Sequence, residues 1–405
     1  MGVFGPAVGN DPGPEGEVLQ AALTCPIGSP SLAGLLKGKR RVLLVSDDHH
    51  RPTPVDRMIP HVLEEIRKAG ISRDQVELMV ALGTHRPMTV PELRKKIGDG
   101  VVDNFRVSNH DWASASGLAF VGKVPPGIEV WVNRAMKEFD AVIGLGSIMP
   151  IDVCGFTGGA KIIIPGLCGE KTNSDLHWVR TEFPQGTIIG RRDNPVREAI
   201  DGAGLASGLS AVFNVVLDSR CRIARAVFGH PVEAHREGAK YALESHSVRL
   251  PEKADIVVAN SYPFDIEFWQ ANKALDHAAL AVRDGGVIIL VSPCTEGLSV
   301  THEEDILRIG YRTSKEIKAL AARGEFGHLV VAVHMIQVAE ATIDRGIACI
   351  LVTSGISPEK LRAVNLGYAP DPQAALESAF RTAGRNARVA VLERASETLP
   401  LTVDG

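Results

Sequence analysis

The chain has 405 residues and a formal net charge of −4, with 44 Lys and Arg against 48 Asp and Glu. This balance excludes a polycationic nucleic-acid binder, and no apolar segment reaches the roughly 20 residues that span a bilayer. The six cysteines contain no CxxC pair, which is typical of reduced thiols inside the cell. Residues 1–16 are rich in Gly and Pro and lack the pattern of a signal peptide. We therefore expect a soluble, cytoplasmic protein with no nucleic-acid or membrane partner.

Short β-branched segments alternate with helical patterns along almost the whole chain. Strands are expected at residues 42–46, 75–82, 141–145, 212–217, 256–259, 287–292, 329–333 and 348–353. Helices are expected at residues 59–69, 91–97, 231–243, 269–282, 314–323, 335–344 and 358–365. Pro60 is expected in the first turn of its helix, and Thr89 as the N-cap of the next. This alternation predicts α/β architecture, with mostly parallel sheets covered by helices.

A polar, proline-containing stretch at residues 247–254 precedes a fresh strand and is the expected domain boundary. We expect two α/β domains, residues 1–250 and 251–405, with the last fifteen or so residues packing back on the first domain. In open α/β sheets, ligands bind beyond the carboxyl ends of the strands, and clefts between domains are preferred sites. The active site is therefore expected in the interdomain cleft. A homo-oligomer is compatible with the sequence.

Ionisable side chains follow the first expected strand directly. Asp47, Asp48, His49, His50 and Arg51 stand in a row at its exit. The arginine can clamp a carboxylate through two hydrogen bonds, and an aspartate can orient it. Two aspartates and two histidines also allow a divalent metal ion. The plain alternative is a solvated loop with an N-capping aspartate.

A histidine, His85, follows the second expected strand in the segment Gly-Thr-His-Arg-Pro at residues 83–87. Imidazole titrates near neutral pH and can act as a general base. A structural histidine is the alternative. Because the carboxyl ends of parallel strands meet at one edge of a sheet, His85 is expected near Asp48 and Arg51.

A glycine-rich segment, Gly-Phe-Thr-Gly-Gly-Ala-Lys, occupies residues 155–161. Its glycines free the backbone to bring N–H groups close to an anion, and Lys161 adds a charge or a nucleophilic amine. Ala160 and Ile162 stand where a Walker A loop has Gly and Ser or Thr, so that motif is excluded. A glycine-rich surface turn is the alternative.

Two further positions carry candidate ligands. His177 stands sixteen residues after Lys161, as a metal ligand or as a packed imidazole. Gln270 and Lys273 are three residues apart, so they share one face of the helix expected there. An amide beside an ammonium suits a 2-hydroxy or 2-keto carboxylate, although an exposed helix pair would carry no function.

Taken together, six segments resemble the lactate racemase family, the nickel-pincer-dependent 2-hydroxyacid racemases and epimerases. The likeness lies in DDHHRPTP (47–54), ALGTHRPMT (81–89), GFTGGAKIIIPGLCGEKT (155–172), HW (177–178), DNPVRE (193–198) and YPFDIEFWQANKAL (262–275). These segments stand in the family's order over residues 40 to about 300. The C-terminal third offers no motif that matches.

The resemblance implies a cofactor and a mechanism. Lys161 would tether a pyridinium nucleotide whose sulfur groups hold nickel, and His177 would complete the nickel coordination. His85 would act as acid and base while the C2 hydride moves to the pyridinium and returns on either face. The other implied contacts are Asp48, Thr157, Gly158 and Gly159 for the cofactor, and Arg51, Gln270 and Lys273 for the substrate, Lys273 also as a catalytic group. Cofactor-maturation enzymes are implied as partners.

The sequence also departs from the family pattern. A second acid/base histidine, about ten residues before the lysine, is replaced by Ile151, with Asp152 beside it. An aromatic residue that the family places over the site from the C-terminal domain is replaced by His334. Asp152 and His334 are therefore candidates for the second base, and His334 for substrate binding. We expect a bulkier or more polar 2-hydroxyacid, or a sugar acid, at least as much as lactate.

Two other hypotheses keep the same scaffold. One is an oxidoreductase or lyase that uses an NAD-type dinucleotide, with a divalent cation at Asp47, Asp48, His49 and His50. The other is a non-catalytic binding protein. A covalent adduct on Lys161 would exclude the first, and turnover that requires His85, Lys161 and His177 would exclude the second.

Overall fold

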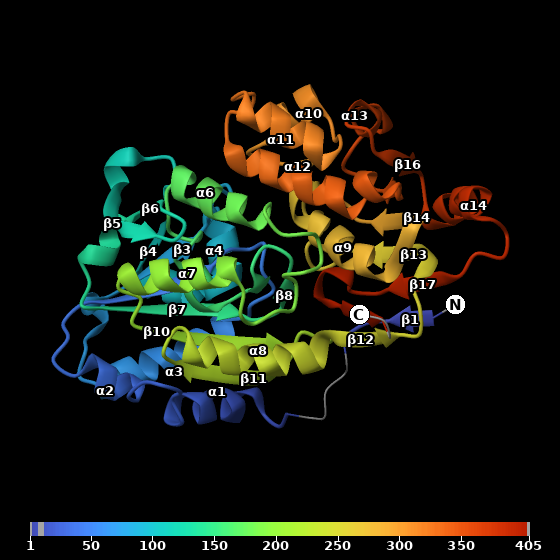
Figure 1. Cartoon of the computed structure of the whole chain (residues 1–405). Helices are drawn as coiled ribbons and strands as arrows, with labels where there is room; N and C mark the ends of the chain where they lie inside the picture. The colour runs from blue at the N-terminus through green and yellow to red at the C-terminus, as the bar shows by residue number, and fades with distance from the viewer. Residues whose placement is uncertain (1, 7–11, 403–405) are drawn as a thin grey trace.

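A computed structural model describes residues 2–6 and 12–402. It contains two six-stranded sheets, each flanked by helices (Figure 1). The first sheet has the order β11 (Ile223–Gly229), β10 (Ala211–Leu217), β7 (Ala141–Ser147), β2 (Val42–Asp47), β3 (Val76–Ala81) and β4 (Arg106–Asn109). Its strands are parallel except for β11, which is antiparallel to β10.

Helices cover both faces of the first sheet, because its strands are apolar on both sides. Val42 and Leu44 of β2 pack against a first layer of helices on one face of the sheet. Leu43 and Val45 pack against a second layer on the other face. The first layer contains α1 (Glu15–Thr24), α2 (Leu32–Leu36), α3 (Val55–Lys68) and α4 (Val90–Ile97). The second contains α7 (Pro195–Ala206) and α8 (Glu233–His246).

The second sheet is entirely parallel. Its order is β1 (Gly2–Phe4), β17 (Val389–Leu392), β13 (Ala254–Asn260), β14 (Val282–Val291), β15 (Ala348–Val352) and β16 (Gly367–Ala369). One face carries α9 (Phe268–Ala281), α10 (Glu303–Ile309), α11 (Ser314–Ala322) and α12 (Leu329–Ala341), and the other carries α14 (Pro372–Ala383). The expected α/β class with mostly parallel sheets is confirmed.

The start and the end of the chain both return to the other half of the molecule. Strand β1 pairs with β17 at the edge of the second sheet, and β18 (Leu399–Thr402) pairs with β12 (Ser247–Leu250). His246 Nδ1 also bonds the carbonyl of Glu397 at 2.7 Å. We propose a domain division near residue 250, across which β1 and β18 each pair with a strand of the other half. Residues 403–405, which were expected to pack on the first domain, lie outside the described residues.

The carboxyl ends of three neighbouring strands meet at one edge of the first sheet. Asp47 at the end of β2 pairs with Ala81 at the end of β3, and Ser46 pairs with Leu145 of β7. Helix α6 (Glu170–Arg180) packs against α12 where the two halves meet (Figure 1). The loops after β2, β3 and β7 therefore face helices of the second half across one cleft.

Two local expectations are wrong, and one helix was not predicted. Residues 329–333 are the first turns of α12 rather than a strand, because a helix buried on nearly all sides shows a continuous apolar run like that of a strand. Pro60 lies inside α3 and not in its first turn, since the helix begins at Val55. Helix α6 begins and ends within a polar segment without clear apolar periodicity, and no helix was expected there. Thr89 does cap α4, in a capping box with Glu92.

None of the helices within residues 2–6 and 12–402 has the length and apolar character needed to cross a membrane.

Candidate active site

One cleft lies between the two halves and encloses about 1140 Å³, its open mouth included. The expected site residues on its wall are Asp48, Arg51, His85, Thr157, Gly158, Lys161, His177, Gln270, Lys273 and His334. They come from six separate segments of the chain. Of the expected site residues, Gly159 and Asp152 do not line it.

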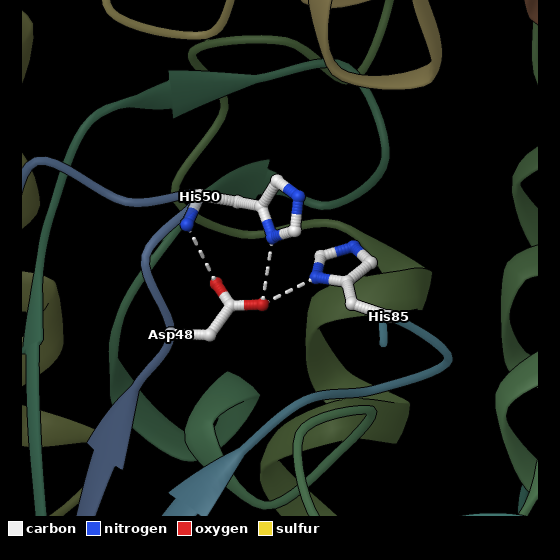
Figure 2. A group of neighbouring side chains, drawn as sticks. All are labelled: Asp48, His50 and His85. Carbon is white, nitrogen blue, oxygen red and sulfur yellow. Dashed lines mark hydrogen bonds and ion pairs between the residues drawn. The ribbon is translucent and has the colours of Figure 1, made fainter. Parts of the chain in front are cut away.

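His85 is held by a carboxylate. Its Nδ1 lies 2.6 Å from Asp48 Oδ2, and His50 Nδ1 lies 3.0 Å from the same oxygen (Figure 2). The backbone N–H of His50 donates to Asp48 Oδ1 at 3.1 Å. Burial alone would raise the pKa of Asp48, but the two histidines outweigh it and hold that pKa well below its usual range. An ionised carboxylate only accepts, so both Nδ1 atoms are donors.

The other ring nitrogen of His85 faces Gln270. Burial lowers the pKa of His85 to about 3, so the ring is neutral at pH 7 and its Nε2 carries a lone pair. Gln270 Nε2 donates to it at 2.9 Å. The amide is oriented by two cations, because Gln270 Oε1 accepts from Arg51 Nη1 at 3.1 Å and from Lys273 Nζ at 2.5 Å.

The cations Arg51 and Lys273 share one environment. Both lie over the ring of Phe264, at 5.6 and 5.5 Å from its centroid. Burial, followed by the charges of Arg51 and Lys161, lowers the pKa of Lys273 well below its usual value. Arg51 is a cation, and a bound anion would hold the amines of Lys161 and Lys273 in their protonated form, so this space suits an anion.

The glycine-rich segment packs closely rather than opening toward an anion. Gly158 and Gly159 have φ of +76° and +61°, and a Cβ on them would lie 2.7 Å from Ile148 and 2.8 Å from His235. The N–H of Gly159 donates to Asn214 Oδ1 at 2.8 Å. This N–H is therefore bound within the fold, and the contact of Gly159 with a cofactor stays a prediction.

Thr157 is also committed to the fold. Its hydroxyl donates to the carbonyl of Ser147 at 2.7 Å and accepts from the N–H of Met149 at 3.0 Å. These bonds fix the loop that carries Lys161, so the contribution of Thr157 is to hold that loop.

Lys161 presents an amine without a partner. Among the described residues no hydrogen bond or ion pair reaches its Nζ. Burial, followed by the charges of Arg51 and Arg197, lowers the pKa of Lys161 to about 8. On the order of a tenth of the amine is therefore neutral, and hence nucleophilic, at pH 7, far more than for a lysine with the ordinary pKa of about 10.4.

His177 presents a ring nitrogen. Its Nδ1 bonds the carbonyl of Asn173 at 2.8 Å, one turn earlier on α6, so Nδ1 carries the proton. Burial, followed by the charge of Lys161, lowers the pKa of His177 to about 3. A neutral imidazole whose Nδ1–H is fixed by a carbonyl is the form that binds metal ions through Nε2.

His334 lies on α12 beside an aromatic ring. It stacks on Trp269 with ring centroids 4.3 Å apart, and its Nε2 lies 2.9 Å from the hydroxyl of Tyr311. Burial lowers the pKa of His334 to about 3. The ring is a neutral wall of the cleft from the second half of the chain.

Comparison with known proteins is decisive. Residues 1–186 match the lactate racemase N-terminal domain and residues 250–396 the lactate racemase C-terminal domain. Lactate racemases of Thermoanaerobacterium thermosaccharolyticum and Lactiplantibacillus plantarum are each 31% identical over 288 residues, 70% of this chain and 67% of theirs. The chain belongs to the lactate racemase family. It is thereby classed with the isomerases.

Solved structures agree with the family. The lactate racemase apoprotein from T. thermosaccharolyticum superimposes with a TM-score of 0.87 at 26% identity, over 99% of this chain and 95% of that one. A Thermotoga maritima protein superimposes with a TM-score of 0.77 at 24% identity, over 98% and 100%. The second likeness shows the fold alone.

In this family member, Asp152 is placed differently from the expectation. It is 1% exposed, and its Oδ2 accepts from Arg180 Nε at 2.6 Å and from Gln337 Nε2 at 3.2 Å. Asp152 therefore lies behind the wall, in an ion pair, and this position does not favour direct contact with a substrate.

The alternative cation site is not assembled as expected. Asp47 pairs with Lys96 at 2.8 Å and accepts from Thr53 at 2.5 Å. The groups that come together are instead Asp48 with His50 and His85, and His49 with His50 and Glu296. In the first group the carboxylate already accepts from both rings.

Sequence reasoning missed several cleft residues, above all Asp276, Gln337 and Asn272. Asp276 stands three residues after Lys273 on α9, which repeats the spacing between Gln270 and Lys273. This repeated spacing of three residues could have identified Asp276 as a further cleft residue from the sequence. Gln337 could not be found, because α12 was divided between a strand and a helix.

Proposed function

We propose that this chain is a racemase or epimerase of a 2-hydroxyacid, lactate or a larger acid, that works with a nickel-pincer nucleotide tethered to Lys161. The observation that carries the proposal is the meeting in one cleft of an unpaired amine, a neutral histidine and an oriented base. Family membership supports lactate as the first substrate to test.

The residues present fit such a nucleotide. Lys161 offers a partly neutral amine for a covalent link, and His177 offers Nε2 to a metal, a ligand type that suits nickel. When bound, the nucleotide would accept hydride from C2 of the substrate and return it. The protein's own groups would bind the acid and move its proton.

The substrate carboxylate has a defined place. Arg51 and Lys273 both donate to Gln270 Oε1 in the ligand-free cleft. A carboxylate oxygen is a stronger acceptor than an amide oxygen. We infer that the substrate replaces this oxygen, and that Gln270 turns toward the ligand.

Movement of Gln270 would also release the base. Its amide now donates to His85 Nε2; once it leaves, that lone pair can accept the substrate's hydroxyl proton. Asp48 would then stabilise the imidazolium through the Nδ1 bond, as the aspartate does in a catalytic triad.

The test is intact-protein mass spectrometry with metal analysis, on protein purified from its native host, where maturation enzymes supply the cofactor. We expect a mass increment on Lys161, about one nickel per chain, and interconversion of D- and L-forms in a panel that includes lactate, glycerate and malate. Lys161→Ala should lose the increment and the turnover. Lys171→Ala, an exposed lysine paired with Asp175 on α6, is the matched control and should keep both.

An unmodified Lys161 with a released dinucleotide would overturn the proposal. It would favour instead an NAD-dependent oxidoreductase or a lyase on the same scaffold.

A further inference from the structure

We propose that Asp276 is the second acid/base residue of this site, and that it exchanges the substrate's hydroxyl proton at the face His85 does not serve. This inference rests on the proposed function and adds a catalytic group to it.

Asp276 shares one helix face with the substrate-side residues. Gln270, Lys273 and Asp276 stand at intervals of three along α9, and all three line the cleft. The carboxyl group is therefore on the wall where the acid would bind. Asp152, by contrast, is separated from this space by its pair with Arg180.

The side chain of Asp276 is buried and has no partner. It is 2% exposed, and its Oδ1 makes no hydrogen bond. Among the described residues, no ion pair or hydrogen bond joins its carboxyl group to a neighbour. Buried polar atoms are normally satisfied, so a carboxyl left without a partner on a cavity wall indicates a ligand that supplies one.

The charges around Asp276 favour its neutral form. Burial raises the pKa of Asp276 well above its usual value, and Asp152 and Glu340 add to this, against the opposing charges of Arg180 and Lys273. The surroundings of Asp276 therefore favour the protonated form of its carboxyl group, which can donate a proton.

His85 and Asp276 are thus complementary before any substrate binds. His85 is neutral and can accept a proton, whereas the surroundings of Asp276 favour the form that can donate one. Environments that push two titratable groups in opposite directions separate the acid from the base. A racemase needs such a pair, because the hydroxyl group points to different sides in the two enantiomers.

The proton balance is complete. With one enantiomer the O–H bond breaks and its proton goes to His85 Nε2; the bound nucleotide would take up the C2 hydrogen with its electron pair and would supply it again at the opposite face. The keto oxygen then takes the proton of the Asp276 carboxyl group. The product alcohol leaves behind an imidazolium and a carboxylate, and transfer of one proton between them restores the starting state.

Steady-state racemisation cannot test this assignment, because the equilibrium constant fixes the ratio of the two directions. The half-reaction, in which one enantiomer is oxidised to the keto acid, can test it. The loaded chain is mixed with D- or L-lactate, or with D- or L-glycerate, in single turnover, and the keto acid is counted after a quench.

We expect the wild type to form keto acid from both enantiomers, but more slowly from the one whose hydroxyl group faces Asp276, because only the ionised fraction of that carboxyl group accepts its proton. Asp276→Asn should slow formation from one enantiomer by about 10²–10⁴-fold and leave the other unchanged, and His85→Asn should show the opposite preference. Asp276→Glu should slow the same enantiomer as Asp276→Asn but by less. An equal effect of Asp276→Asn on both enantiomers, or none on either, would overturn the assignment.

A second measurement needs neither cofactor nor substrate. In the unloaded chain at pH 7, the infrared difference between wild type and Asp276→Asn should contain the carbonyl band of one protonated carboxylic acid. Other buried acids, such as Glu397, cancel in the difference. A carboxylate band in its place would overturn the assignment, while a wild type that forms no keto acid from any enantiomer would overturn the proposed function.

Discussion

The cleft wall is built in opposite ways at the two ends of one stretch of α9, which runs from Gln270 to Asp276. At one end His85 is fixed on both ring nitrogens, by Asp48 and by Gln270. At the other end Asp276 is more deeply buried than His85, but its carboxyl group has no partner among the described residues. The first group is set in position in the ligand-free cleft, whereas the proposed role of the second requires a ligand as its partner. If both groups act as proposed, catalytic groups cannot be recognised by hydrogen bonding alone.

The largest effect is expected where the fixed end loses its anchor. In Asp48→Asn an uncharged amide replaces the carboxylate that accepts from both imidazoles. The His85 tautomer is then no longer fixed, and its imidazolium is no longer stabilised by a negative charge. We expect kcat to fall by about 10³–10⁴-fold, the size seen when a triad aspartate becomes asparagine. The measurement is kcat and KM, with the melting temperature as a check on folding. A fall below tenfold would show that His85 is not preorganised by this carboxylate.

A smaller effect is expected for the anion clamp between the two ends. Arg51→Lys keeps the charge but loses the planar fork of the guanidinium. Charge-assisted hydrogen bonds contribute about 1.5–3 kcal/mol, so we expect kcat/KM to fall by about 10- to 150-fold, mainly through KM. Arg57→Lys, in a partly exposed pair with Glu15, is the control and should change neither constant. An unchanged KM in Arg51→Lys would place the carboxylate elsewhere.

The site was only partly predictable from the sequence. Asp48 and His85 each follow a parallel strand. The carboxyl ends of neighbouring parallel strands lie at the same edge of a sheet, whatever the conformation of the loops, so these residues could be predicted to lie close together. The glycine-rich segment was located, but its N–H directions were not, because Asn214 on another strand takes one of them. Asp276 was missed because its meaning depends on burial beside Asp152 and Arg180, which are far away in sequence.

The fold shows the same limit in α12. A helix that is buried by α6, α9 and α11 has no polar face to give it a helical period. Its first turns therefore had the pattern of a strand. His334 and Gln337 stand nearly one turn apart on the same helix, and their joint place in the cleft could not be inferred from that pattern.

A moderate effect is expected from His50, which donates a hydrogen bond to Asp48, the carboxylate that fixes His85. His50→Gln removes the ring that donates to Asp48 Oδ2. A hydrogen bond to a charged group contributes about 1.5–3 kcal/mol, and the Gln amide can restore about half of it, so we expect a loss of about 4- to 12-fold in kcat. His49→Gln is the matched control in the same loop, because no hydrogen bond reaches either of its ring nitrogens, and its kcat should stay at the wild-type value. Equal losses in both variants would mean that the loop, and not the bond, carries the effect.

The smallest effect concerns stability, and its sign differs between the two ends. The pKa of Asp276 is raised on folding, so its contribution to stability is present below the unfolded value of about 3.9 and is lost as the pH rises through the folded pKa. The pKa of His85 is lowered to about 3, so its contribution is present above the unfolded value of about 6.5 and is lost as the pH falls toward 3. Relative to wild type, Asp276→Asn should therefore gain free energy of unfolding as the pH rises from 4 to 8. His85→Asn should gain it as the pH falls from 7 to 4. Urea unfolding of the unloaded variants across this range measures both trends, and parallel trends would show that the two ends do not hold opposite protonation states.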